Sequence, residues 1–144
     1  MTEGHEGLRK TFRDVSACRI ATVGSGGAPH VATRWFVWVE EGLFVATRQD
    51  DVTWRNAIAE PRVSVVIDRG REWVDLAGVR LSGPAMPIVM EVPELRAPMT
   101  AFHEKYRTFL AEDGFERFAA SVPQLVFLQL GLGDIDAWDH RTRP

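Results

Sequence analysis

The chain has 144 residues, of which 45% are hydrophobic and 26% are charged, and its formal net charge at pH 7 is -3. These ordinary globular proportions exclude collagen-like repeats and low-complexity arrays, and the length predicts a single domain over residues 1–144. A slightly acidic chain has no general attraction for phosphate backbones or anionic lipid, so we expect neither nucleic acid nor a membrane as a partner.

The first predicted elements are a short helix and three strands. Leu8, Phe12 and Val15 recur at the spacing of an amphipathic helix. The three segments rich in β-branched and aromatic residues that follow are Arg19–Val23, His30–Val39 and Leu43–Thr47. Because tight turns join them, they predict an antiparallel meander.

The middle of the chain predicts one more helix and further strands. Asp50 or Asp51 can cap a helix over Thr53–Glu60, and Pro61 ends it. The strands that follow are Arg62–Asp68, Trp73–Ser82 and Ala85–Glu91, the last being either a sixth strand or a bent extension of the fifth.

The last third predicts helices and a final strand. An apolar stripe predicts a helical segment from Val92, a second short helix includes Phe115 and Phe118, and Gln124–Leu130 is the last predicted strand. Six or seven mostly antiparallel strands favour a closed or half-closed barrel, because closure removes exposed edges. A doubly wound α/β fold would need a helix after nearly every strand.

Only weak signals point to catalysis, metal binding or export. Gly24–Pro29 lacks the last glycine of a dinucleotide fingerprint and precedes a strand, so it is interpreted as a hairpin turn. The four histidines have no metal-ligand spacing, and no nucleophile elbow is present. We assign no catalytic residue and no metal ligand. The lone Cys18 and the absence of an apolar leader predict a reducing, cytoplasmic compartment.

The block from residue 34 to residue 56 carries the candidate binding residues. Arg34 lies among apolar neighbours in a strand, so its charge must pair, reach solvent or meet a ligand. The polar groups flanking the following strand-to-helix turn are Thr47, Arg48, Arg55 and Asn56. Hydroxyl, amide and guanidinium groups at such a turn can hold a phosphate. Surface salt bridges explain the two arginines equally well.

Several segments together resemble a known family. They are Arg19–Val23, Gly27–Val31, Trp35–Trp38, Leu43–Arg48, Arg55–Asn56, Glu60–Val65, Leu76–Gly83 and Trp138–Arg141. Their order and spacing are similar to those of the pyridoxamine-5′-phosphate-oxidase-like split β-barrel flavoproteins, and look closest to their flavin- and deazaflavin-dependent oxidoreductase branch. The resemblance covers most of the chain.

This resemblance implies a mainly β homodimer of six-stranded antiparallel split β-barrels, with cofactor clefts at the dimer interface. The 5 Trp and 8 Phe, many for so small a chain, also favour a dimer. The implied activity is hydride transfer between bound FMN or coenzyme F420 and a small planar substrate. The implied cofactor-binding residues are Ala32, Thr33, Arg34, Trp35, Thr47, Arg48, Thr53, Arg55, Asn56 and Trp138.

The sequence departs from the family pattern next to the expected phosphate. Thr53 stands where the family usually has a lysine, and Asp50 and Asp51 stand in a loop that is commonly basic or small. Carboxylates repel a phosphate. These departures leave a second function open, in which the same barrel is a non-catalytic binding or carrier protein for a flavin, haem or another tetrapyrrole.

Overall fold

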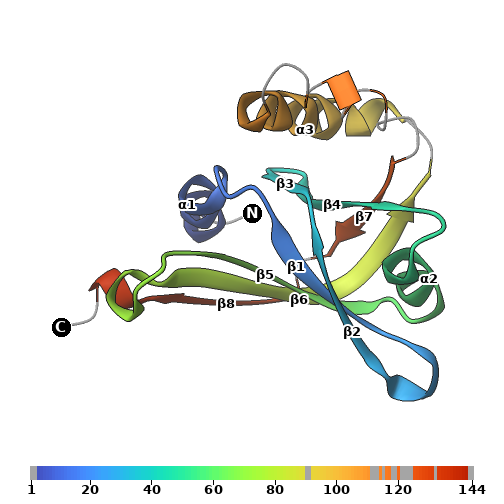
Figure 1. Ribbon diagram of the computed structural model, residues 1–144, viewed down its shortest axis with the longest axis horizontal. Helices are drawn as coiled ribbons and strands as arrows, with labels where there is room; N and C mark the ends of the chain where they lie inside the picture. Colours follow the sequence, from blue (N-terminus) through green and yellow to red (C-terminus); the bar gives the residue numbers. More distant parts are fainter. Residues whose placement is uncertain are drawn as a thin grey trace.

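Figure 1 shows the arrangement of strands and helices in the computed structural model, which describes residues 3–89, 92–110, 114, 116, 117, 120, 125–131 and 133–142. The strands are β1 (Cys18–Val23), β2 (Pro29–Arg34), β3 (Phe36–Val39), β4 (Gly42–Arg48), β5 (Arg62–Arg69), β6 (Ala77–Ile88), β7 (Leu125–Leu130) and β8 (Asp134–Asp139). The helices are α1 (Glu3–Phe12), α2 (Val52–Ala59) and α3 (Arg96–Phe109).

The described strands form one 8-stranded antiparallel sheet. Their order is β2-β1-β5-β6-β7-β4-β3, with β8 paired to β6 outside this path. The two ends of the path, β2 and β3, follow each other in the chain and are separated only by Trp35. The sheet therefore curls until its two ends approach, as the ribbon shows (Figure 1), and the predicted mainly β split-barrel architecture is confirmed.

Two of the expected strands have different bounds in the structure, and these two changes offset each other in the number of strands. The expected strand His30–Val39 is divided at Trp35, because β2 pairs with β1 whereas β3 pairs with β4. The expected strand Trp73–Ser82 begins only at Ala77, after a 3-10 turn, and continues without interruption to Ile88. The predicted second short helix around Phe115 and Phe118 falls on residues outside the described part.

Strand β8 was not predicted from the sequence. Aspartate is disfavoured in strands, and β8 contains three of them. In the sheet, β8 pairs with the first half of β6, and Arg80 of β6 lies 3.7 Å from the carboxylate of Asp134 and 3.8 Å from that of Asp136. Arg80 therefore partly balances the negative charges of Asp134 and Asp136 from the neighbouring strand. A local sequence pattern cannot reveal a pairing between two distant strands.

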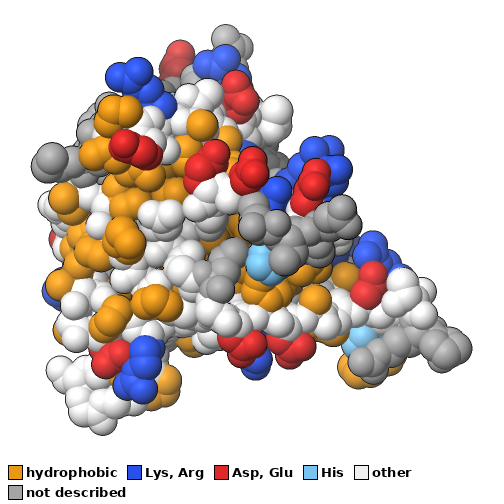
Figure 2. All heavy atoms as spheres, turned by 180° about the vertical axis from the view of Figure 1, so that it is seen from behind, with side chains coloured by type: hydrophobic (Ala, Val, Ile, Leu, Met, Phe, Trp, Pro, Cys, Tyr) orange, Lys and Arg blue, Asp and Glu red, His pale blue; other side chains and the backbone are white. Residues whose placement is uncertain are grey.

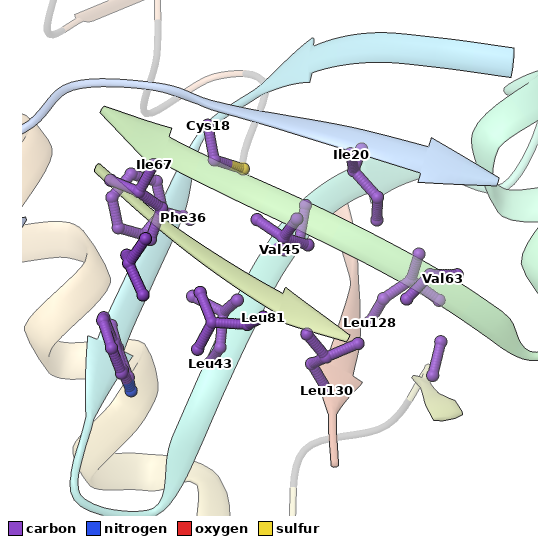
Figure 3. Close-up of a cluster of buried hydrophobic side chains, with 14 of the residues drawn as sticks. Cys18, Ile20, Phe36, Leu43, Val45, Val63, Ile67, Leu81, Leu128 and Leu130 are labelled. Carbon is purple, nitrogen blue, oxygen red and sulfur yellow. The ribbon is translucent and has the colours of Figure 1, made fainter. Parts of the chain in front are cut away.

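The main core lies inside the curled sheet. In β5 the buried residues Val63, Val65 and Ile67 alternate with half-exposed ones, as the period of 2 requires for a half-buried strand. Figure 3 shows apolar side chains from several strands pointing toward one another in this core, among them Cys18 of β1 and Phe36 of β3.

Helix α3 covers a second core on the outer side of the sheet. Figure 1 shows α3 above β3 and β4, and this cluster includes Phe44, Phe102, Tyr106 and Phe127. Because both faces of β4 are covered, six of its seven residues are buried. No helix among the described residues is both long enough and apolar enough to cross a bilayer.

Helix α2 is placed by the cap that the sequence suggested. Of the two candidate aspartates, Asp51 is the N-cap, and its side chain accepts a hydrogen bond from the Thr53 N–H. The helix ends at Ala59, just before Pro61. This cap fixes the turn between β4 and α2, where the candidate binding residues lie.

Candidate functional site

A pocket of about 340 Å³ opens where the ends of β2 and β4 meet the start of α2. Five of the residues implied by the family resemblance line it, namely Thr33, Arg34, Trp35, Thr47 and Arg48. Asp51 lines the same pocket. The curl of the sheet therefore brings together the end of β2 and the end of β4, the two strand ends at which the sequence placed candidate binding residues.

Three side chains that line the pocket and the buried Thr53 behind them form a hydrogen-bonded group, which we call the Asp51 cluster (Arg34, Thr47, Asp51 and Thr53). The Asp51 carboxylate pairs with Arg34 Nη2 and accepts hydrogen bonds from Thr47 Oγ1 at 3.3 Å and from the Thr53 N–H at 3.1 Å. Arg34 Nη2 also donates to Thr53 Oγ1 at 3.3 Å. Three donors, each from a different element, thus meet around one carboxylate.

The electrostatics of the Asp51 cluster favour an anion. Thr47 and Thr53 are 2% and 0% exposed. Burial by itself would raise the pKa of the Asp51 carboxyl, but the Thr53 N–H and the Arg34 charge outweigh it and lower that pKa below its ordinary value. Asp51 is therefore ionised at neutral pH, and Arg34 has the charged partner that its position in the strand requires.

Arg48 lines the pocket, and Arg55 of α2 contacts the turn that borders it; we call these two the rim arginines. Arg48 Nε is 3.4 Å from Asp50 Oδ1, and both side chains are more than half exposed. Arg55 donates through Nη1 to the main-chain oxygen of Asp50 at 2.8 Å. Exposed pairs of this kind contribute little to stability. An anionic ligand can therefore draw Arg48 away from Asp50 at small cost.

Five of the ten residues implied by the resemblance do not line this pocket within one chain, namely Thr53 and Arg55, described above, and Ala32, Asn56 and Trp138. Ala32 is packed against the main core. Asn56 donates to Thr22 Oγ1 at 3.2 Å and so fastens α2 to β1. Trp138, on β8, lies against Gly78 of β6 and lines a different, smaller cavity.

The contact between Trp138 and Gly78 gives a first prediction. A Cβ at Gly78 would come within 2.3 Å of the Trp138 ring, so Gly78→Ala should displace the indole and lower the free energy of unfolding by about 1–3 kcal/mol. Tryptophan fluorescence and urea denaturation measure both effects. Gly7→Ala, where nothing lies within 4 Å, is the control. An unchanged spectrum and stability in Gly78→Ala would contradict the close packing.

Two residues of α3 that the sequence did not mark as functional hold the strand break beside Arg34. The Tyr106 ring stacks on Trp35 with centroids 4.3 Å apart, and its hydroxyl accepts the Phe36 N–H at 2.8 Å. Lys105 Nζ donates to the Phe36 carbonyl at 2.9 Å. Tyr106 was recognised only as part of an apolar stripe, and nothing in the sequence distinguished Lys105.

The donors around the pocket match the anionic end of a flavin-type cofactor. A phosphate is bound by N–H, hydroxyl and guanidinium groups, and the Asp51 cluster offers all three. The cluster already holds an anion, namely the carboxylate of Asp51. Arg34, Thr47 and Thr53 therefore supply donors of the types that bind a phosphate, but the Asp51 carboxylate engages these donors here. The rim arginines Arg48 and Arg55 supply further positive charge.

Solved structures with the same fold cover nearly the whole chain. The conserved hypothetical protein Rv2991 from Mycobacterium tuberculosis is 22% identical, with a TM-score of 0.76 over 98% of this chain and 86% of that one. HutZ, the heme storage protein from Vibrio cholerae, is 17% identical, with a TM-score of 0.69 over 95% and 93%. A FAD-binding protein from Mesorhizobium loti is 15% identical, with a TM-score of 0.66 over 92% and 90%.

The sequence comparison agrees with the structural one. No curated protein matches the chain significantly. The family model described as pyridoxamine 5'-phosphate oxidase matches residues 5–138, which is most of the sequence. With the curled antiparallel sheet and the structural neighbours, this match confirms the resemblance noted in the sequence, and the chain belongs to the pyridoxamine 5'-phosphate oxidase family.

Proposed function

We propose that the protein binds a flavin or deazaflavin, FMN or coenzyme F420, and transfers a hydride between it and a small planar substrate. The observation that carries this proposal is the pocket at the end of β2, where an edge strand, Trp35 and a set of anion-binding donors meet. The family membership of the chain supports it. A FAD-binding protein of the same fold is a further, weaker support.

The pocket offers separate contacts for the two ends of such a cofactor. Among the described strands β2 pairs only with β1, so its outer edge presents main-chain N–H and C=O groups for the heteroatoms of a ring. Thr33 and Trp35 would orient the ring and shield it from water. Arg48 and Arg55 would hold the anionic tail. The cofactor supplies the hydride chemistry, and the protein supplies binding and orientation.

A second candidate function is that of a non-catalytic protein with the same fold. The same pocket would then belong to a binding or carrier protein for a flavin, haem or another tetrapyrrole. The ion pairing of Arg34 and Arg48 with Asp51 and Asp50 favours this alternative, because it leaves less positive charge for a phosphate. A heme storage protein of the same fold also supports it. The absorption spectrum of the purified protein separates the two, since a flavin band and a Soret band differ.

We also propose that the protein is a homodimer. Figure 2 shows apolar side chains gathered over one flank of the molecule, and Val31 of the edge strand β2 is 63% exposed. A groove of about 660 Å³ lies on the outer face of β1, β5 and β6. Such apolar surface is typical of an interface. Sedimentation at micromolar concentration is the measurement, and a monomer alone would contradict the proposal.

The cofactor proposal predicts that Arg48→Ala weakens FMN or deazaflavin binding about tenfold, because a charge-assisted hydrogen bond to the tail is lost. The measurement is a fluorescence titration of both cofactors against the wild-type protein and the variant. Arg19→Ala is the matched control, since Arg19 is also exposed and ion-paired, with Asp68, but lines neither this pocket nor the groove on β1, β5 and β6.

The outcomes of this titration distinguish an error about the role of Arg48 from an error about the proposed function. Unchanged affinity in Arg48→Ala would remove Arg48 from the site. Failure of both cofactors to bind the wild-type protein saturably would overturn the proposed function itself.

A further inference from the structure

The carboxylate of Asp51 occupies the place where the pocket is best equipped to bind an anion. Its donors come from three separate elements: Arg34 ends β2, Thr47 lies in β4, and the Thr53 N–H belongs to the first turn of α2. A helix cap alone requires only the last of these bonds. The bonds from Arg34 and Thr47 show that the Asp51 carboxylate is also the counter-ion of Arg34 in the pocket.

We propose that Asp51 is a built-in anion that determines the charge of the ligand that the pocket accepts, an inference that rests on the proposed cofactor function. While Asp51 is in place, the inner donors exclude a phosphate, and ligands bind through the ring contacts and the rim arginines. When the carboxylate is replaced by a neutral group, the same donors accept a phosphate.

Two physical reasons exclude a phosphate from the intact cluster. The donors of Arg34, Thr47 and Thr53 that converge on Asp51 are already engaged by its carboxylate. A phosphate sharing them would also lie within a few ångströms of a carboxylate in a partly buried place, where repulsion between like charges is only weakly screened. Asp50 is different, because its side chain is 77% exposed and faces only the rim.

The chain offers a matched pair of substitutions. Asp51→Asn and Asp50→Asn remove the same charge from neighbouring positions, but only the first removes the carboxylate that Arg34 and Thr47 bind. Asparagine caps helices as well as aspartate does, so α2 keeps its start. Asp51→Ser, which also preserves a cap, is a second variant in case the amide disturbs the packing around Arg34.

The first measurement uses inorganic phosphate and pyrophosphate, which carry no ring. We expect both ions to raise the melting temperature of Asp51→Asn and Asp51→Ser at concentrations at least about tenfold lower than the wild type or Asp50→Asn requires, a difference of about 1.4 kcal/mol. An equal response in all four proteins would overturn the inference. So would a response of Asp50→Asn as large as that of Asp51→Asn.

The second measurement compares FMN with riboflavin, which differ only in the phosphate. Arg48 accounts for a preference for FMN of about tenfold in the wild type, and we expect this preference to be at least about tenfold larger in Asp51→Asn than in the wild type or Asp50→Asn. An equal preference for FMN in the wild type and Asp51→Asn would overturn the inference and leave the cofactor proposal standing. If neither flavin nor deazaflavin binds any variant, the cofactor proposal fails, and the phosphate measurement alone decides the role of Asp51.

Discussion

Replacement of Tyr106 by alanine is expected to lower the free energy of unfolding by about 3–5 kcal/mol, the largest loss from any single change considered for this fold. Tyr106 is 1% exposed and packs between Trp35 on one side and Phe102, whose ring centroid is 4.8 Å away. Removing the ring leaves a cavity between α3 and the sheet, in the second core. Urea denaturation followed by circular dichroism measures the loss.

Tyr106→Phe separates the hydroxyl from the ring. The hydroxyl accepts the buried Phe36 N–H at 2.8 Å and lies 2.8 Å from the Ser16 carbonyl. Without it the Phe36 N–H is unsatisfied, so this variant should lose about 1–3 kcal/mol while keeping the core filled. Thr108→Ala, an exposed change on the same helix, is the control. Stability equal to wild type in Tyr106→Phe would show that the hydroxyl does not fix the strand break.

The sequence predicted those features of the fold that depend on neighbouring residues. The alternation in β5, the Asp51 cap and the end of α2 before Pro61 follow from local patterns. The division of the expected strand at Trp35 does not, because it depends on which strands pair with each half. The Trp35 carbonyl accepts the Ala46 N–H at 2.9 Å, a contact between the break and β4 that no local pattern contains.

The sequence predicted which residues lie near the candidate site, but it did not predict which of them contact one another. Arg34, Thr47 and Thr53 were expected near an anion, and the structure places them together. Asp51 was expected to be one of two possible helix caps and to repel a phosphate from nearby, not to bind the donors of the site. Its position at the centre of the donors results from the curl of the sheet, which brings the end of β2 to the turn after β4. A local sequence pattern does not reveal that the end of β2 and the turn after β4 lie close together in space.

Lys105 places a positive charge against the same strand break. Its Nζ donates to the Phe36 carbonyl and lies 3.5 Å from the centroid of the Phe36 ring. Burial lowers the pKa of Lys105 from 10.5 to about 8, and the negative charge of Asp14 only partly opposes this. Burial also raises the pKa of the Cys18 thiol to about 12 and raises that of Tyr106, so neither titrates near pH 8.

The lowered pKa of Lys105 predicts that the protein becomes more stable as the pH rises from about 8 to about 10.5. Below this range both the folded and the unfolded chain hold the proton. Within it the folded chain has released the proton while the unfolded chain keeps it, so the free energy of unfolding increases, by at most about 3 kcal/mol. Urea denaturation at several pH values should show this rise in the wild type and in Lys10→Met, whose lysine is exposed, but not in Lys105→Met. A wild-type profile that stays flat across this range would mean that the Lys105 amine is solvated, and that its bond to the Phe36 carbonyl does not hold the strand break.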